Sequence, residues 1–307
     1  MDGTAWARYA VQNQDCWAAV VIHSNATSAA LAAVNTDVST YDPTGAMGFF
    51  YSEGRSYLTV DQWIPPQAIP VLSRGLGIAN AAFAAQVLTT APTSIPASAF
   101  GFSEYNVDRI THFAALPVVS ICMLYLLVYT FFTVNLWSEP RLQLQARLRL
   151  SSALAMRLLI PLIQYFFLSL WFSLVSLAWD VSFTAYFGHT GFFLFWMSNW
   201  VTMTALGFAI EGVYTLFGQA FIPFFLGVWI IANVSAAFVS IADQHWFYGY
   251  GYIMPVWNAV DAAKCIIFGT ANRLEQNFGV NLGSVVGYGL SICLFTWASR
   301  KWGGREG

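Results

Sequence analysis

Long apolar stretches separated by short polar breaks fill the chain from Ala114 onward, whereas residues 1–110 mix apolar and polar positions. Five of the stretches are long enough, at a rise of about 1.5 Å per residue, to cross a hydrocarbon core roughly 30 Å thick. They cover approximately residues 114–134, 158–179, 190–210, 221–242 and 280–298. The pattern predicts an α-helical polytopic membrane protein with five spanning helices in residues 111–307, preceded by a separate domain in residues 1–110.

The composition supports a membrane protein. Of the 307 residues, 57% are hydrophobic and only 9% are charged, whereas soluble domains contain about 25% charged residues. A surface this apolar cannot all face water, so we expect membrane lipids to be partners. The net charge of −2 provides no basic surface for nucleic acid, and we exclude nucleic acid as a partner.

The distribution of Lys and Arg predicts the orientation. Seven cations flank the first and last spans on what should be one side of the membrane: Arg141, Arg147, Arg149, Arg157, Arg300, Lys301 and Arg305. The opposite side has only Lys264 and Arg273 between the predicted spans. Because cytoplasmic loops are rich in Lys and Arg, we expect a cytoplasmic C-terminus and an outside or lumenal N-terminal domain. The sequon at Asn25 agrees, since it would be glycosylated only on that side.

Residues 1–110 are predicted to form an α+β domain. The apolar run Cys16–Ile22 and the segment Ala46–Tyr51 are typical of strands. Small residues from Ser28 to Val34 favour a helix, and the Ala-rich stretch Ile69–Leu88 favours a longer one. Pro92, Pro96 and the residues between them are typical of a linker.

Part of this domain resembles a known family. The stretch CWAAVVIHSNATSAALAAV, followed by STYDPTGAMGFFYSEGR, resembles the outer domain of the fungal nitrosoguanidine-resistance membrane proteins. The resemblance implies a multispanning plasma-membrane or endomembrane protein linked to drug resistance and lipid stress. It also implies a layout similar to the membrane half of type-2 ABC exporters, with one helix before the outer domain and five after it. We therefore expect a first helix to be encoded upstream of Met1, missing here through truncation or an incomplete gene prediction.

Four polar residues fall inside or at the end of predicted spans, namely Gln164, Asn199, Glu211 and Asn233. Such groups are costly in lipid unless they face protein or a cavity, so they are candidates for a polar pathway. For the three amides the competing interpretation is a hydrogen bond between helices. For Glu211 it is simple solvation near the cytoplasmic interface.

The segment between the last two spans, residues 243–279, is apolar but interrupted. Its apolar runs are too short to span, so we expect it to dip into the membrane or lie on it, where it could form the lip of an exit path. Asp261 and Lys264 stand three residues apart and can pair on one helical face. A substrate contact is the competing interpretation for these two charges.

Small residues recur at every fourth position of the last span, at Gly279, Gly283, Gly287 and Ser291. This spacing lets two membrane helices approach closely, and we interpret it as a packing face rather than as a channel filter, although it includes the motif Val286-Gly287-Tyr288-Gly289. Assembly into a homo-oligomer or with other membrane proteins is one use of such a face.

The sequence predicts no enzyme. It contains no Gly-x-Ser-x-Gly, His-Glu-x-x-His or phosphate-binding Gly-x-x-x-x-Gly-Lys motif, so we expect no catalytic residues, no cofactor and no metal. Of the four cysteines, Cys16 and Cys265 are both expected outside and are candidates for a disulfide.

Two functional hypotheses follow. The exporter-like layout favours a transport-related protein that exports or extrudes lipophilic compounds or lipids. The alternative is a non-transporting membrane scaffold or lipid-stress regulator that acts through helix packing and the outer domain.

Overall fold

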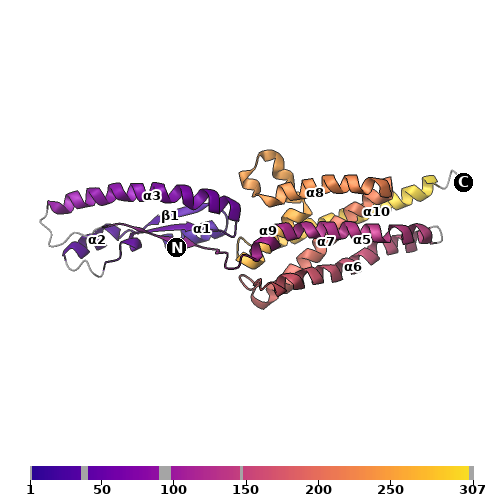
Figure 1. Cartoon of the computed structure of the whole chain (residues 1–307), viewed down its shortest axis with the longest axis horizontal. Helices are drawn as coiled ribbons and strands as arrows, with labels where there is room; N and C mark the ends of the chain where they lie inside the picture. The colour runs from indigo at the N-terminus through magenta and orange to yellow at the C-terminus, as the bar shows by residue number, and fades with distance from the viewer. Residues whose placement is uncertain (1, 36–40, 90–97, 146–147, 304–307) are drawn as a thin grey trace. The chain divides into compact units, whose positions relative to one another are not determined.

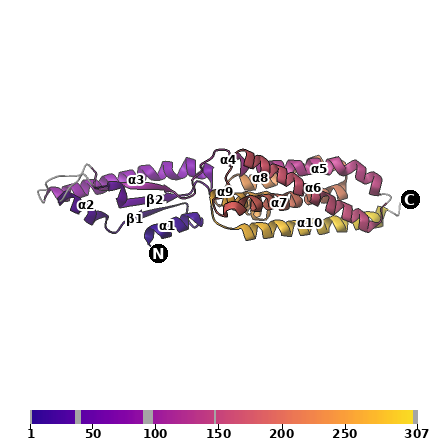
Figure 2. The ribbon, with the colours of Figure 1, turned by 90° about the horizontal axis from the view of Figure 1, so that it is seen from below.

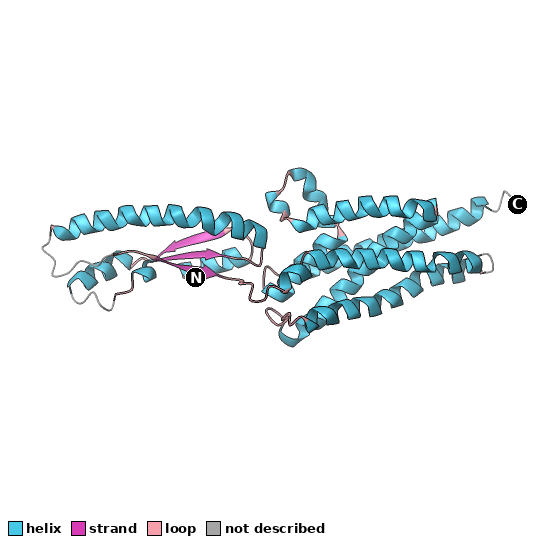
Figure 3. Ribbon diagram, in the orientation of Figure 1, coloured by secondary structure: helices cyan, strands magenta, loops and turns pink. Residues whose placement is uncertain are grey.

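The computed structural model describes residues 2–35, 41–89, 98–145 and 148–303. The chain folds into two compact units, Met1–Ile110 and Thr111–Gly307. All three strands belong to the first unit, and the second is helical (Figure 3). The predicted linker around Pro92 and Pro96 lies outside the described residues, as do Arg147 and Arg305.

The first unit is built around a small sheet of three strands, β1 (Ala18–Ile22), β2 (Met47–Tyr51) and β3 (Phe102–Asn106). β1 pairs antiparallel with β2, and β3 pairs parallel with β2 on its other edge. A helix that the sequence did not predict, α1 (Gly3–Gln12), packs on β1 and β2 through Ala7 and Val11, which meet Phe50. The two predicted strands are present, and β3 was missed.

A buried carboxyl group closes the end of this sheet. Asp108 accepts a 2.6 Å hydrogen bond from the hydroxyl of Ser52, and both side chains are buried. Burial raises the pKa of the Asp108 carboxyl from its ordinary value to about 6, although the Ser52 hydrogen bond and the charge of Arg8 oppose the rise. The neighbouring carbonyl oxygen of Asp108 accepts from the amide of Gly54, so this residue anchors the segment after β2.

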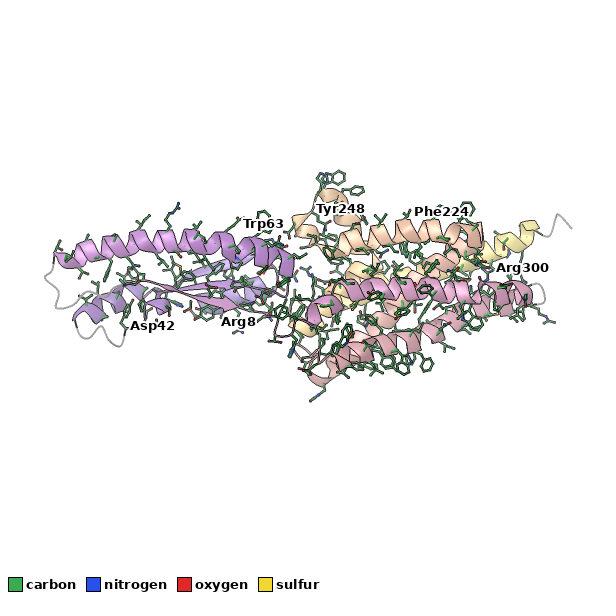
Figure 4. All side chains as sticks on the ribbon, in the orientation of Figure 1. Arg8, Asp42, Trp63, Phe224, Tyr248 and Arg300 are labelled. Carbon is green, nitrogen blue, oxygen red and sulfur yellow. The ribbon has the colours of Figure 1, made fainter. Side chains whose placement is uncertain are left out.

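The longest helix of the first unit, α3 (Tyr57–Leu88), begins twelve residues before the predicted Ile69 and contains Pro65, Pro66 and Pro70. Its C-terminal part packs against α2 (Ala26–Asn35) through a core of Ala30, Val34, Phe83 and Val87. Most of its other side is exposed, as Trp63 illustrates in Figure 4. Length and composition alone make α3 a sixth helix capable of crossing a membrane, one more than the five predicted.

The second unit contains five long helices that lie side by side in both Figure 1 and Figure 2. Each overlaps one predicted span, although the bounds differ by up to about ten residues: α5 (Ile121–Gln145), α6 (Leu150–Ala178), α7 (Gly191–Phe217), α8 (Ile222–Phe238) and α10 (Leu274–Gly303). All of them except α8 extend beyond the predicted span into polar sequence, which a search for apolar runs does not include. The first predicted span begins too early, because residues 115–118 form the separate short helix α4 (Ala115–Val118).

α7 is the central helix of the second unit. All residues from Val201 to Gly212 are buried, and α7 packs against α5, α6, α8 and α10. The outer helices instead present apolar side chains outward, as Phe224 of α8 does in Figure 4. This arrangement suits a protein whose solvent is lipid, because outward-facing apolar groups there carry no cost. The chain is an integral, multi-pass membrane protein.

The segment between α8 and α10 has an exposed first part, in which Trp246 is 82% exposed, and a buried second part. It contains a 3-10 helix (Trp246–Ile253) and then α9 (Pro255–Phe268), of which 12 of 14 residues are buried. α9 packs against α7, α8 and α10, and Gly269, in the left-handed conformation with φ of 81°, ends it. The second half of this apolar segment is therefore a helix enclosed by other helices of the unit.

Candidate functional site

A fully buried carboxylate, Glu211 on α7, is held between two arginines from neighbouring helices. Arg141 of α5 donates a hydrogen bond from Nη1 to Glu211 Oε2. Arg157 of α6 places its Nη1 3.7 Å from Glu211 Oε1. The two arginine side chains are each only 4% exposed. We call Arg141, Arg157 and Glu211 the buried triad.

The buried triad lies one to two turns from the ends of three helices. Arg141 is four residues before the end of α5, Glu211 six before the end of α7, and Arg157 seven after the start of α6. These separations correspond to about 6–11 Å along the axis. Arg300 of α10 reaches the same end of the unit, where its Nη1 donates to the carbonyl oxygen of Leu148 at 3.0 Å. We call this the cationic end, which carries Arg141, Arg149, Arg157, Arg300 and Lys301.

Further hydrogen bonds position the members of the triad. Arg157 Nη1 also donates to Thr215 Oγ1, and Thr215 Oγ1 donates to the Glu211 carbonyl at 2.8 Å. Tyr214 OH donates to the carbonyl of Ser138 at 3.3 Å, which ties α7 to α5. Together these contacts fix how α5, α6 and α7 are aligned with one another near the triad.

Tyr165 of α6 lies fully buried against a glycine of α7. A Cβ atom added to Gly207 would lie only 2.3 Å from the Tyr165 hydroxyl and 2.5 Å from its ring, so the close approach requires glycine at this position. The charges of Glu211 and Arg141 act on this hydroxyl. Within the described residues, neither Tyr165 OH nor Arg141 Nη2 has a hydrogen-bond partner.

The charges of the triad do not cancel. Two guanidinium groups and one carboxylate leave one net positive charge in a place where burial makes charge costly. Glu211 acts on Arg157 as an opposite charge, whereas Arg141 and Arg300 add positive charge there. The arrangement is therefore suited to holding α5, α6 and α7 together.

A groove of about 320 Å³ lies between α5 and α6 beyond the triad. Five of its lining residues are aromatic, namely Tyr125, Tyr129, Trp171, Phe172 and Trp179. Towards the cationic end it is followed on the same helices by Trp137, whose indole Nε1 donates a 2.7 Å hydrogen bond to Gln164 Oε1. Along α5 and α6 the groove is thus followed by the Trp137–Gln164 hydrogen bond and then by the triad.

The four residues of the predicted polar pathway make separate contacts in the structure. Gln164 bonds to Trp137, and Asn199 Nδ2 donates to Ser173 Oγ at 3.1 Å. Asn233 accepts from the Val256 amide at 3.3 Å, which joins α8 to α9. None of the four lines the α5–α6 groove or the smaller apolar pocket between α5, α8 and α9.

Residues of α9 take part in a second buried polar cluster. Asp261 accepts a 2.9 Å hydrogen bond from Asn277 Nδ2, and Asn281 Nδ2 donates to Thr202 Oγ1 at the same distance. Asp261 therefore contacts α10. Lys264 also has an interaction partner, and its pairing with Asp261 stays a prediction.

The predicted packing face of the last span is largely open. A Cβ atom at Gly279, Gly283 or Gly287 would meet nothing within 4 Å, so these glycines do not pack against a described helix of this chain. The packing glycine of α10 is instead Gly289, where a Cβ would lie 3.7 Å from Phe208. Ser291 does pack, because its hydroxyl would lie 3.4 Å from a Cβ at Gly212. The four-residue spacing in the sequence identified the small residues of α10, but it could not predict which of them face another helix of this chain.

Two predictions concern the regions outside the spans. Asn25 is exposed just before α2, with its carbonyl accepting from the Ser28 hydroxyl, so it is accessible for a glycan. All four cysteines are free in the structure, and the disulfide considered between Cys16 and Cys265, which belong to different units, stays a prediction. Cys265 is fully buried within α9, and burial raises the pKa of the Cys16 thiol.

Sequence reasoning identified Glu211 but missed both of its partners. Arg141 and Arg157 were counted as cations of a cytoplasmic loop, because Pro140 was expected to lie beyond the first span. In fact α5 continues through Pro140, and α6 begins eight residues before the predicted span. One signal in the sequence could have indicated the triad. Two arginines flank the short connection between the first two spans, and a glutamate stands at the end of the third span, on the same side of the membrane.

Comparison with known proteins places the chain among membrane proteins without a described activity. The family described as "Protein of unknown function (DUF3533)" matches residues 5–288. An uncharacterised endoplasmic reticulum membrane protein of Saccharomyces cerevisiae, YJR015W, is 30% identical over 211 residues, which cover 67% of this chain and 41% of that protein. The chain thus spans less than half the length of this relative. Neither description names the nitrosoguanidine-resistance family, and no solved structure matches.

We predict that Gly207→Val lowers both abundance and thermal stability, because the new side chain collides with Tyr165. Overpacking of this kind typically costs about 1–3 kcal/mol. The matched control is Gly283→Val, the same change in the middle of another membrane helix, where the added atoms meet open space. Thermal unfolding of the purified full chain in detergent measures both, and equal melting temperatures for the two variants would contradict the Tyr165–Gly207 contact.

Proposed function

This chain belongs to the DUF3533 family, and we propose that it is a transport-related membrane protein that exports or extrudes lipophilic compounds or lipids. The proposal has no enzymatic step. The observation that carries it is the groove between α5 and α6, which combines aromatic walls with a volume of about 320 Å³. Pockets for small lipophilic molecules have volumes of about 300–1,000 Å³ and are lined mainly by apolar and aromatic side chains.

The contacts that follow the groove along α5 and α6 support transport rather than simple storage in our proposal. Beyond Tyr129, the Trp137–Gln164 hydrogen bond joins α5 to α6, and the buried triad then joins both helices to α7. A lipophile in the groove therefore meets two polar barriers in the direction of the cationic end. In our proposal these barriers make the groove accessible from one side at a time, as alternating access requires.

The energy for transport is proposed to come from outside this chain. The sequence has no phosphate-binding Gly-x-x-x-x-Gly-Lys motif, and its layout resembles the membrane half of an ABC exporter. The cationic end, with the exposed Arg149, is the proposed contact for such a partner.

We propose that the cationic end is cytoplasmic and that residues 1–110 are lumenal. The excess of Lys and Arg at this end supports the orientation, and the exposed Asn25 supports a lumenal first unit. The name of the yeast relative supports the endoplasmic reticulum membrane as the location. In this arrangement five helices, α5 to α8 and α10, span the bilayer.

The open face of α10 favours the alternative function, a non-transporting membrane scaffold or lipid-stress regulator. Gly279, Gly283 and Gly287 form a flat strip that no described helix of this chain covers. Close packing of such strips brings membrane helices together, so the strip supports assembly with a second copy or with another membrane protein.

The orientation predicts a glycan on Asn25. Treatment of the expressed protein with a glycan-removing enzyme should increase its electrophoretic mobility, and Asn25→Gln should already migrate at the faster position. A protein tag inserted after Tyr51 provides the second measurement. Its accessibility from the cytosol in selectively permeabilised cells would contradict the proposed orientation, whether or not the sequon is used.

The transport proposal predicts that filling the groove blocks efflux. Val175 lines the groove and is 47% exposed, so Val175→Trp adds a large side chain without disturbing the core. Cells that express the wild-type chain should lose a preloaded fluorescent lipophile, such as Nile red, faster than cells without it. Val175→Trp should reduce this difference at least severalfold at equal protein abundance.

Val228→Trp provides the matched control, because Val228 is an exposed residue of α8 that does not line the groove. This variant should export at the wild-type rate. If cells with and without the chain lose the lipophile equally fast, the transport proposal is wrong and the scaffold alternative remains.

A further inference from the structure

The aromatic groove lies where α5 and α6 separate from each other. Both helices pack mainly against α7 and only slightly against one another. The Trp137–Gln164 hydrogen bond joins them on the side of the cationic end, whereas the groove lies between their opposite ends. Two helices that are joined towards one end and separate towards the other leave a narrow, elongated space between them.

The walls of the groove are aromatic rings, and its floor consists of small side chains. Tyr125 and Tyr129 of α5 stand one helical turn apart and are half exposed, and Trp171 of α6 is exposed further. Cys122 and Ser176, which also line the groove, are buried. Because the large rings stand at the rim and the small groups lie at the bottom, the groove suits a flat molecule that enters from the surrounding lipid.

The groove lies within one leaflet of the membrane. Its residues on α5 extend to Tyr129, eight residues after the start of that helix, and those on α6 begin at Leu168, ten residues before its end. These separations correspond to about 12 and 15 Å along the helix axes, whereas half of a bilayer with its headgroups measures roughly 20–22 Å. An occupant therefore has one end at the level of the headgroups. In the proposed orientation this is the lumenal leaflet.

Two phenol hydroxyls of the groove are available to a ligand. Within the part of the chain that the structure describes, the hydroxyls of Tyr125 and Tyr129 make no hydrogen bond. Helical side chains lean towards the N-terminus of their helix, which for α5 is the end at the headgroups. Of the two residues Tyr125 stands nearer this end, so its hydroxyl is the one placed to bind a polar group at the headgroup level.

We propose that the groove binds a sterol, with the fused rings between the aromatic walls and the sterol hydroxyl hydrogen-bonded to Tyr125. A flat ring system meets aromatic faces over a large area. Because a sterol is also rigid, its binding costs little conformational entropy, whereas a flexible acyl chain would have to be immobilised.

The uncharged lining of the groove favours a sterol over a phospholipid. None of the described lining residues is Asp, Glu, Lys, Arg or His, so a charged headgroup finds no partner of opposite charge there. A sterol has one small hydroxyl at the end that lies among the headgroups, and a single phenol hydroxyl is sufficient to bind it.

The inference names the lipophile of the proposed function, and it rests on that function only for the idea that the bound molecule is moved. Its test measures binding of tritiated cholesterol to the purified full chain in detergent, by scintillation proximity. We expect saturable binding that unlabelled cholesterol displaces. Epicholesterol has the hydroxyl in the opposite configuration, and oleyl alcohol carries a hydroxyl on a flexible chain. Both should compete at least severalfold less well than cholesterol.

Two pairs of variants locate the site. Val175→Trp fills the groove and should abolish saturable binding, whereas Val228→Trp adds the same bulk to an exposed position of α8 outside the groove and should not change it. Tyr125→Phe removes only a hydroxyl and should weaken cholesterol binding about two- to tenfold, with loss of the preference over epicholesterol. Tyr129→Phe is the same change one turn deeper and should keep both the affinity and the preference.

Equal binding by the wild-type chain and Val175→Trp would overturn the proposal, as would equal competition by oleyl alcohol, which would assign the groove to acyl chains. Equal affinities of Tyr125→Phe and Tyr129→Phe would reject the assigned hydroxyl contact. If cholesterol does not bind but Val175→Trp still blocks efflux of Nile red, this inference is wrong and the transport proposal stands. Sterol binding without efflux would reject the transport proposal and leave this inference standing.

Discussion

The packing of the second unit depends on one constraint. Glu211, on the central helix α7, is a carboxylate without access to water. An isolated charge at such a depth is too costly to retain, so its position requires the two arginines that reach it from α5 and α6. Each arginine is fixed in turn by the register of its own helix. One carboxylate therefore determines how α5, α6 and α7 are aligned along their lengths.

The remaining features of the unit follow from this alignment. Tyr165 of α6 packs against α7, one turn from Glu211, because Gly207 leaves room for its ring. One turn beyond Arg141 the Trp137–Gln164 bond closes the space between α5 and α6. Further along, the same two helices leave an aromatic groove. The buried ion pairs thus lie at one end of α5 and α6, and the aromatic groove lies towards the other.

The spans themselves could be predicted from the sequence, because a run of about 20 apolar residues is a local property. Their ends could not, since α5 continues through Pro140 and α6 starts within polar sequence. The partners of Glu211 were missed for the same reason, as Arg141 and Arg157 were assigned to a loop. Periodicity found the small residues of α10 but could not show that Gly283 faces outward while Gly289 packs. Contacts between residues distant in sequence decide these points.

The central claim is that Arg141 and Glu211 hold their helices together through direct pairing, and a double-mutant cycle tests it most directly. Thermal unfolding of the full chain would be compared for the wild type, Arg141→Gln, Glu211→Gln and the double variant. Glu211→Gln removes the carboxylate that pairs with Arg141, and breaking a buried pair in this way typically costs about 3–5 kcal/mol. The account predicts that the double variant loses at least about 1 kcal/mol less than the sum of the two single losses. Losses that add within about 0.5 kcal/mol would contradict it.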